Sequence, residues 1–64
     1  MVGPKTQRLI DQLRLWCDQE KGRRTEAARS IGVTTQAITD WFAGRRNPTA
    51  EQILDVQEFL NRQS

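Results

Sequence analysis

Short hydrogen-bonding side chains recur at close spacing within residues 33–43, which read VTTQAITDWFA. They are Thr34, Thr35, Gln36, Thr39 and Asp40. In a helix these positions would share one side, and the opposite side would be apolar, with Ala37, Ile38, Trp41 and Phe42. Hydroxyl and amide groups both donate and accept hydrogen bonds, and a carboxylate accepts them. A row of such groups facing solvent is suited to recognising a polar partner.

Positive charge gathers around this segment, although the net charge of the chain is only +2. Residues 23–48 carry five arginines against Glu26 and Asp40, for a net charge of +3. Residues 1–22 carry four basic against three acidic side chains (+1), and residues 49–64 carry one against three (−2). Such an uneven distribution is expected where a surface meets phosphate groups.

Several kinds of chemistry are excluded by the residue types. The chain has no histidine and a single cysteine, Cys17, so it offers neither a zinc or haem cluster nor an internal disulfide. The commonest general base is therefore absent, and a serine or cysteine nucleophile would have no histidine partner. We expect no enzyme activity, no cofactor, no metal and no small-molecule substrate.

Length and composition indicate one small folded domain over residues 1–64. Apolar residues make up 36% and charged residues 28% of the sequence, and a chain of this size can bury only one small core. The mean hydropathy is −0.74, and no apolar run approaches the roughly 20 residues of a membrane helix. The start, MVGPKTQRLIDQLR, has no apolar stretch typical of a signal peptide. These features predict a cytoplasmic protein that does not enter a membrane.

The hydrophobic period is helical throughout and no segment alternates like a strand. The sequence predicts an all-α fold, a compact bundle of four helices, with a fifth as an open alternative. The first helix is expected from Pro4 or Lys5 to Gly22. Its apolar stripe comprises Leu9, Ile10, Leu13, Trp16 and Cys17.

The remaining helices have recognisable ends. The second is expected over Arg24 to Ile31, closed by Gly32, with Thr25 as an alternative later start. The third spans Thr35 to Ala43, with Thr34 as its cap and Gly44 at its end. The fourth opens with a capping box formed by Thr49 and Gln52. Its inward stripe is expected to contain Ile53, Val56 and Leu60.

Two large apolar residues flank that stripe on the fourth helix. At 100° per residue, Leu54 and Phe59 fall on opposite sides of it. One small core would not bury both fully. Either both pack against the core, or one flank forms a self-association surface; both alternatives stay open at this point.

Residues 24–43, taken as one unit, have a short helix, a tight turn at Gly32 and a second helix. This segment resembles the helix-turn-helix of the λ-repressor and Cro-like (XRE-type) family of phage and bacterial regulators. The similarity covers about residues 5–60 and is strongest over EAARSIGVTTQAITDWFAGRRNPTAEQI. It implies a sequence-specific transcriptional regulator that binds double-stranded DNA, with a phage or prophage repressor as the expected type.

The resemblance also implies which residues meet DNA. The helix over residues 35–43 would lie in the major groove, with its N-terminal residues against base edges. The expected base-reading residues are Thr35, Gln36, Thr39 and Asp40. The expected contacts to the DNA backbone are Arg24, Thr34, Arg45, Arg46 and Asn47. A glutamine amide can pair with N6 and N7 of adenine, and a threonine methyl can meet a thymine methyl.

Some alternatives remain. Asp40 could accept from cytosine N4, or it could orient a neighbouring arginine, because a carboxylate otherwise repels phosphate. A homodimer could form on DNA or through Leu54 and Phe59. The whole domain could instead be a protein-interaction module, antitoxin-like or a co-regulator, since a fold does not fix a function.

Overall fold

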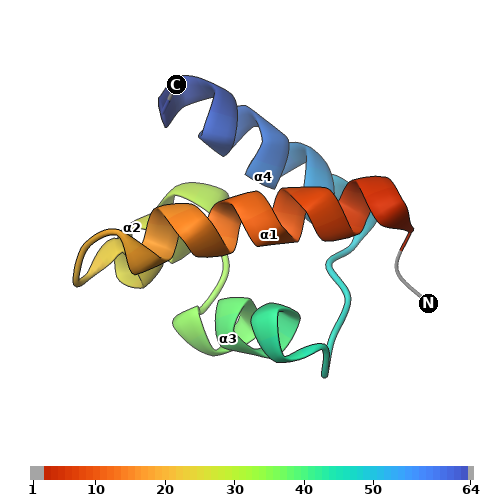
Figure 1. Ribbon diagram of the computed structural model, residues 1–64, viewed down its shortest axis with the longest axis horizontal. Helices are drawn as coiled ribbons and strands as arrows, with labels where there is room; N and C mark the ends of the chain where they lie inside the picture. The colour runs from red at the N-terminus through yellow and green to blue at the C-terminus, as the bar shows by residue number, and fades with distance from the viewer. Residues whose placement is uncertain (1–2, 64) are drawn as a thin grey trace.

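The computed structural model describes residues 3–63, and four helices account for most of them (Figure 1). They are α1 (Pro4–Asp18), α2 (Arg23–Ile31), α3 (Thr35–Ala43) and α4 (Ala50–Gln63). Within residues 3–63 there is no strand and no fifth helix. The predicted all-α fold of four helices is therefore confirmed.

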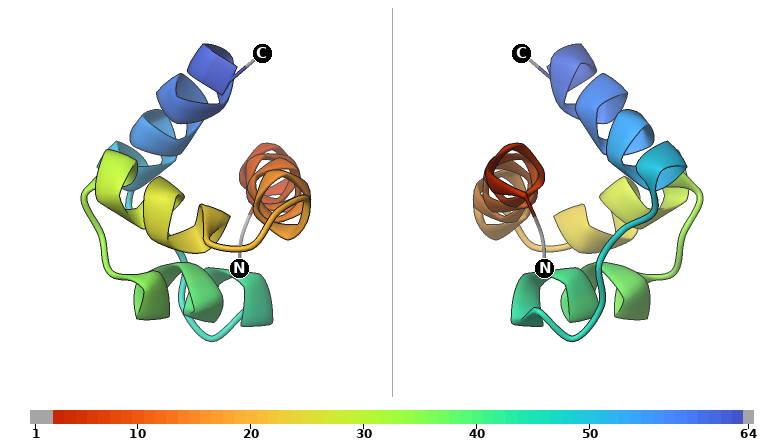
Figure 2. Two further views of the ribbon diagram at one scale, coloured as in Figure 1. Left: turned by 90° about the vertical axis from the view of Figure 1, so that its left-hand side faces the viewer. Right: turned by 90° about the vertical axis from the view of Figure 1, so that its right-hand side faces the viewer.

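Helices α1 and α2 each pack against all three of the other helices. Helix α4 lies above α1 and α3 lies below it in Figures 1 and 2, with α2 between these levels. The backbone of α3 lies close to those of α1 and α2 but not to that of α4. This arrangement leaves the lower side of α3 uncovered.

The core takes side chains from every helix. Leu13 of α1, Ile38 of α3 and Val56 of α4 are almost completely buried. Helix α2 contributes the small Ala27 and Ala28, which allow a close approach of neighbouring helices, together with Ile31. Trp16 of α1 meets Phe59 of α4 edge to face, with ring centroids 4.8 Å apart, a geometry that aromatic pairs favour.

The predicted helix caps are present. The Thr34 hydroxyl accepts a hydrogen bond from the Ala37 backbone N–H at 3.1 Å, which satisfies an otherwise unpaired donor at the start of α3. Thr49 and Gln52 form the reciprocal capping box at the start of α4, with distances of 2.8 and 3.2 Å. Local sequence therefore sets where both helices begin.

Two predicted helix boundaries were wrong. Helix α1 ends at Asp18, not at Gly22, and α2 begins at Arg23, which rules out a later start at Thr25. Arg23 explains the early end, because its guanidinium donates to the Trp16 carbonyl at 3.3 Å and to Gln19 Oε1 at 2.9 Å. The Trp16 carbonyl lies at the end of α1, and a longer helix would have used it internally.

Leu54 and Phe59, the two residues that flank the inward stripe of α4, differ in burial. Phe59 is only 3% exposed and Leu54 is 59% exposed. Phe59 thus belongs to the core, whereas Leu54 lies in solvent. A self-association surface that includes Phe59 is excluded, which corrects that part of the homodimer prediction. Ile53, which was expected in the inward stripe, is only half-buried.

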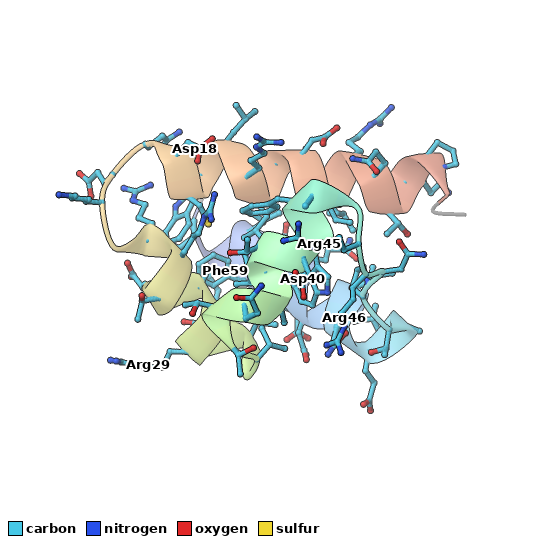
Figure 3. The ribbon with its side chains drawn as sticks, turned by 90° about the horizontal axis from the view of Figure 1, so that it is seen from below. Asp18, Arg29, Asp40, Arg45, Arg46 and Phe59 are labelled. Carbon is cyan, nitrogen blue, oxygen red and sulfur yellow. The ribbon has the colours of Figure 1, made fainter. Side chains whose placement is uncertain are left out.

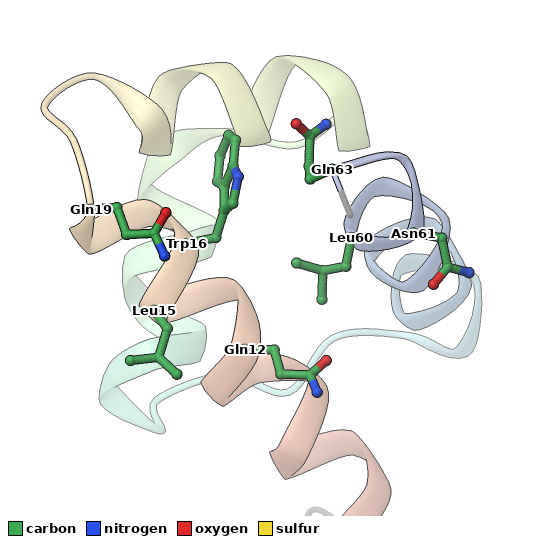
Figure 4. A pocket seen from close by; sticks show the side chains of 7 residues that line it. All are labelled: Gln12, Leu15, Trp16, Gln19, Leu60, Asn61 and Gln63. Carbon is green, nitrogen blue, oxygen red and sulfur yellow. The ribbon is translucent and has the colours of Figure 1, made fainter.

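An open groove separates the C-terminal halves of α1 and α4 (Figure 4). Its lining residues are Gln12, Leu15, Trp16, Gln19, Leu60, Asn61 and Gln63. None of the residues predicted to bind DNA is among them.

Among residues 3–63, no helix combines the length and the apolar character that crossing a bilayer requires.

Candidate nucleic-acid interface

One side of α3 is buried against the rest of the protein, and the opposite side faces solvent. Ile38 is fully buried and Trp41 is 4% exposed, whereas Thr35 and Gln36 are exposed. Figure 3, seen from below, shows α3 in front of the other helices. Its turn from α2 is fixed at Gly32, where φ is +88° and the Val33 N–H donates to the Ala28 carbonyl at 2.9 Å, as in a Schellman motif.

The N-terminus of α3 is a polar end with positive character. Thr34, Thr35 and Gln36 are all exposed there, and the Thr34 hydroxyl that caps the helix keeps its own O–H as a donor. Within residues 3–63, the N–H groups of Thr35 and Gln36 have no hydrogen-bond partner. Unpaired N–H groups and the helix dipole together favour an anion such as phosphate at this end.

Asp40 lies at the centre of a chain of contacts along the outer face. Its Oδ1 accepts from Gln36 Nε2 at 3.1 Å and from Arg45 Nε at 3.0 Å. Arg45 is bound a second time through its backbone N–H, which donates to the Asp40 carbonyl at 2.9 Å. Figure 3 shows Asp40 beside Arg45. Arg45, in the loop after α3, is therefore attached to the helix through the side chain and the backbone of Asp40.

These contacts also set the charge of Asp40. The hydrogen bond from Arg45, and next the one from Gln36, hold the pKa of the Asp40 carboxyl below its usual range. Because the folded-state pKa is lowered, the stabilisation from these contacts is complete at neutral pH and is lost as the pH falls through that pKa. Asp40 is thus a carboxylate at neutral pH, and it faces Arg45 as an ion pair.

The Gly44 turn directs the basic loop. Gly44 has φ of +77°, and its N–H donates to the Trp41 carbonyl at 3.2 Å. Together with the Arg45 N–H to Asp40 bond this completes a Schellman motif at the end of α3. The turn brings Arg45 next to Asp40 on the outer face of the helix. Arg45, Arg46 and Asn47 are all exposed.

Arg24 and Thr39 meet each other across the α2–α3 junction. Arg24 Nη1 donates to Thr39 Oγ1 at 3.2 Å, and its guanidinium carbon lies 5.1 Å from the centroid of the Phe42 ring. Both residues are half-buried. Of the four residues predicted to read bases, Thr35 and Gln36 are exposed, while Thr39 and Asp40 are half-buried. Gln36, Thr39 and Asp40 each have a side-chain hydrogen bond within the protein.

Four arginines have no side-chain partner within residues 3–63, namely Arg8, Arg29, Arg46 and Arg62. Arg29 and Arg46 are exposed and form no ion pair or side-chain hydrogen bond there. In Figure 3 they lie to either side of α3. From the sequence Arg29 could either contact the DNA backbone or only face water, and it is not among the predicted site residues. Its place on α2, away from the buried Ala27, Ala28 and Ile31, is the signal that marks it as a surface cation.

The arrangement suits binding and offers no covalent chemistry. Over residues 35–49 Asp40 is the only acid and is paired with Arg45, so Arg46 leaves a net positive charge. Cys17 lies on α1 in the core, and burial raises the pKa of its thiol. Among residues 3–63 no group of three or more histidine, cysteine, aspartate or glutamate side chains could hold a metal ion.

A family model described as helix-turn-helix matches residues 12–63 of the chain. The matched residues include the whole of α2, α3 and α4 and the second half of α1. Comparison with curated proteins gave no match, and comparison with solved structures gave none either.

Proposed function

Because this chain belongs to the helix-turn-helix family of the XRE and Cro type, whose domains bind DNA and are not enzymes, we propose that it is a sequence-specific regulator of the repressor type. In this proposal one domain over residues 1–64 occupies an operator in double-stranded DNA and blocks transcription, as in phage and prophage repressors. A cytoplasmic location is part of the same proposal. The observation that carries it is the uncovered face of α3, held from behind by Ile38 and Trp41.

Base reading is assigned to the N-terminal half of α3. Gln36 has an exposed amide that can pair with N6 and N7 of adenine, and the exposed Thr35 can place its methyl against a thymine methyl. Thr39 and Asp40 belong to the same face but are half-buried. Thr39 is proposed to make a smaller contribution to base reading than Thr35 and Gln36.

Contacts to the DNA backbone are assigned to the edges of this face. Thr34 and the α3 N-terminus would hold one phosphate. Arg45, Arg46 and Asn47 would hold the strand beside the Gly44 turn, and Arg24 would act from the α2 side. Such contacts fix the register of the protein on the duplex without reading its sequence.

The salt dependence of affinity tests the phosphate contacts. If about three phosphates are neutralised per copy, the slope of log affinity against log salt should be roughly −3 for one copy and about −5 to −6 for two copies. Fluorescence anisotropy with a labelled duplex, measured from low to high salt, gives this slope. A flat response with no preference for any duplex would rule the proposal out.

The Gln36→Ala variant tests base reading. Loss of a bidentate base contact should cost about 1–3 kcal/mol on the preferred duplex. It should cost much less on random DNA, because the phosphate contacts remain. Thr35→Ser, which keeps the hydroxyl and removes the methyl, is the matched control for a thymine contact. Equal losses on both duplexes would reduce Gln36 to a backbone contact.

A homodimer on DNA forms part of the proposal. Helix-turn-helix dimers bind half-sites about one helical turn apart, so duplexes selected from a random pool should contain a palindrome with centres roughly 10 base pairs apart. Sedimentation of the protein with and without the selected duplex gives its stoichiometry. A single asymmetric site bound by one copy would contradict this part alone.

The second candidate function is a protein-interaction module, and the open groove between α1 and α4 favours it. Leu15 at that groove is 67% exposed and Leu54 is 59% exposed. Leu15→Asp and Leu54→Asp should abolish binding of a protein partner and leave DNA binding intact. Arg45→Ala with Arg46→Ala should have the opposite effect, which separates the two functions.

A further inference from the structure

We propose that Asp40 is a positioning residue, which determines specificity by holding the amide of Gln36 and the guanidinium of Arg45 in their DNA-facing orientations. This inference rests on the proposed function. It assigns Asp40 a role through its two neighbours and removes it from direct base contact.

The contact with Gln36 decides which end of its amide faces outward. A carboxylate only accepts hydrogen bonds, so the nitrogen of the Gln36 amide must be the end that faces Asp40, and Nε2 donates to Oδ1 at 3.1 Å. One N–H of that nitrogen and the carbonyl oxygen Oε1 remain for a partner. One donor beside one acceptor is the pattern that pairs with N7 and N6 of adenine. Asp40 thus prepares the amide for this base before DNA arrives.

The contact with Arg45 likewise holds a side chain in a DNA-facing orientation. Arg45 donates to Asp40 through Nε at 3.0 Å, while its side chain is 62% exposed. The two terminal nitrogens of a guanidinium carry four of its five N–H donors, and these lie beyond the atom that Asp40 holds. The Arg45 N–H to Asp40 carbonyl bond at 2.9 Å holds the backbone as well. Arg45 is therefore presented to a phosphate with its direction already fixed.

Asp40 itself is poorly placed to touch a base, because its side chain is only 16% exposed. Its Oδ1 already accepts from both neighbours. A fully solvated carboxylate on this face would repel the phosphates that surround a base edge. The pairing with Arg45 offsets that charge and leaves Arg46 as the unpaired cation of the loop. Organising its neighbours is the role that agrees with these contacts.

The first test uses the free protein, so its outcome does not depend on DNA binding. NMR signals of the Gln36 side-chain amide and of the Arg45 Nε–H should titrate together between about pH 6 and pH 2. Their common midpoint should lie below about 3.9, the ordinary value for aspartate. The charged groups that face Asp40 are Arg45 and Arg46. In Asp40→Ala both titrations should disappear. Signals that ignore the ionisation of Asp40 would overturn the inference.

The second test compares two variants on DNA. Asp40→Asn keeps a carbonyl oxygen that can accept from both neighbours, so its preference for the selected duplex over random DNA should stay within about threefold of the original. Asp40→Ala should reduce that preference about tenfold or more, which is the size of a lost bidentate base contact. The double variant Gln36→Ala with Asp40→Ala should lose little beyond Gln36→Ala alone, because the two act as a unit.

Other results separate the explanations. If both Asp40 variants bind every duplex more tightly and by the same factor, Asp40 acts only through its charge and the inference is wrong. If the original protein prefers no duplex at all, the proposed function fails, and the NMR titration still decides whether Asp40 orients its neighbours. Far-UV circular dichroism of each variant confirms that α3 is intact.

Discussion

At the level of single residues, Arg23 and Arg29 of α2 show how differently one residue type is used. The guanidinium of Arg23 donates to the Trp16 carbonyl, lies 4.5 Å from the Trp16 ring centroid and pairs with Glu20 at 3.4 Å. Arg29 has no such contact within residues 3–63. Although both carry the same charge, the first holds the end of α1 in place and the second is available to an outside partner.

We therefore predict that Arg23→Ala lowers the free energy of unfolding by about 1–2 kcal/mol, because it removes the hydrogen bonds to Trp16 and Gln19 and the cation–π contact. Arg29→Ala, its matched control on the same helix, should change unfolding by less than about 0.5 kcal/mol. Urea denaturation followed by circular dichroism measures both. If Arg29 touches phosphate, only Arg29→Ala should reduce the salt slope of DNA binding without loss of stability.

At the level of the helix, α3 owes its direction to the turns and caps at its two ends. Thr34 fixes the start, and Gly44 with φ of +77° lets the chain turn so that Arg45 returns to Asp40. A Cβ added at Gly44 would meet no atom within 4 Å. The need for glycine there is therefore one of backbone conformation and not of space.

Gly44→Ala should accordingly destabilise the domain by about 1–2 kcal/mol, the cost of a left-handed conformation for a residue with a Cβ. Gly44→Asn should cost less, because asparagine adopts this conformation more readily. Thermal unfolding compares the two variants. A cost that is the same for both, or no cost for either, would show that the turn does not depend on φ at this position.

At the level of the whole molecule, a very small core links the binding face to the rest of the fold. Leu13, Ile38 and Val56 are the largest of the fully buried side chains and come from α1, α3 and α4. The backbones of α3 and α4 do not approach each other closely, and the shared core, to which α1 and α2 also contribute, connects the two. Loss of packing in α1 should therefore release α3 as well.

Leu13→Ala tests this connection. A buried leucine replaced by alanine costs about 3–5 kcal/mol, which is comparable to the whole stability of a domain this small. We expect loss of helical circular dichroism and of DNA binding together at 37 °C. Leu15→Ala on the same helix is the control, and it should leave both unchanged because Leu15 is 67% exposed. Loss of binding with the fold intact would place the coupling elsewhere.

The elements of this protein were largely predictable from nearby residues. The bounds of α3, its Thr34 cap and the capping box of α4 depend on groups no more than four residues apart, and all were predicted correctly. The helix-turn-helix pairing was also predicted, because Gly32 and the apolar positions around it lie within one short segment. The choice of Thr35 and Gln36 as outward residues agrees with their exposure.

The sequence by itself thus determined which segments are helical, where α3 and α4 begin and which face of α3 is polar, since hydrogen bonds and helical periodicity act over a few residues. Only the tertiary structure decided that Phe59 is buried while Leu54 is exposed, that Arg23 ends α1, and that Arg24 holds Thr39. These outcomes depend on side chains of different helices that compete for the same space. Such competition is settled by three-dimensional packing and leaves no local pattern in the sequence.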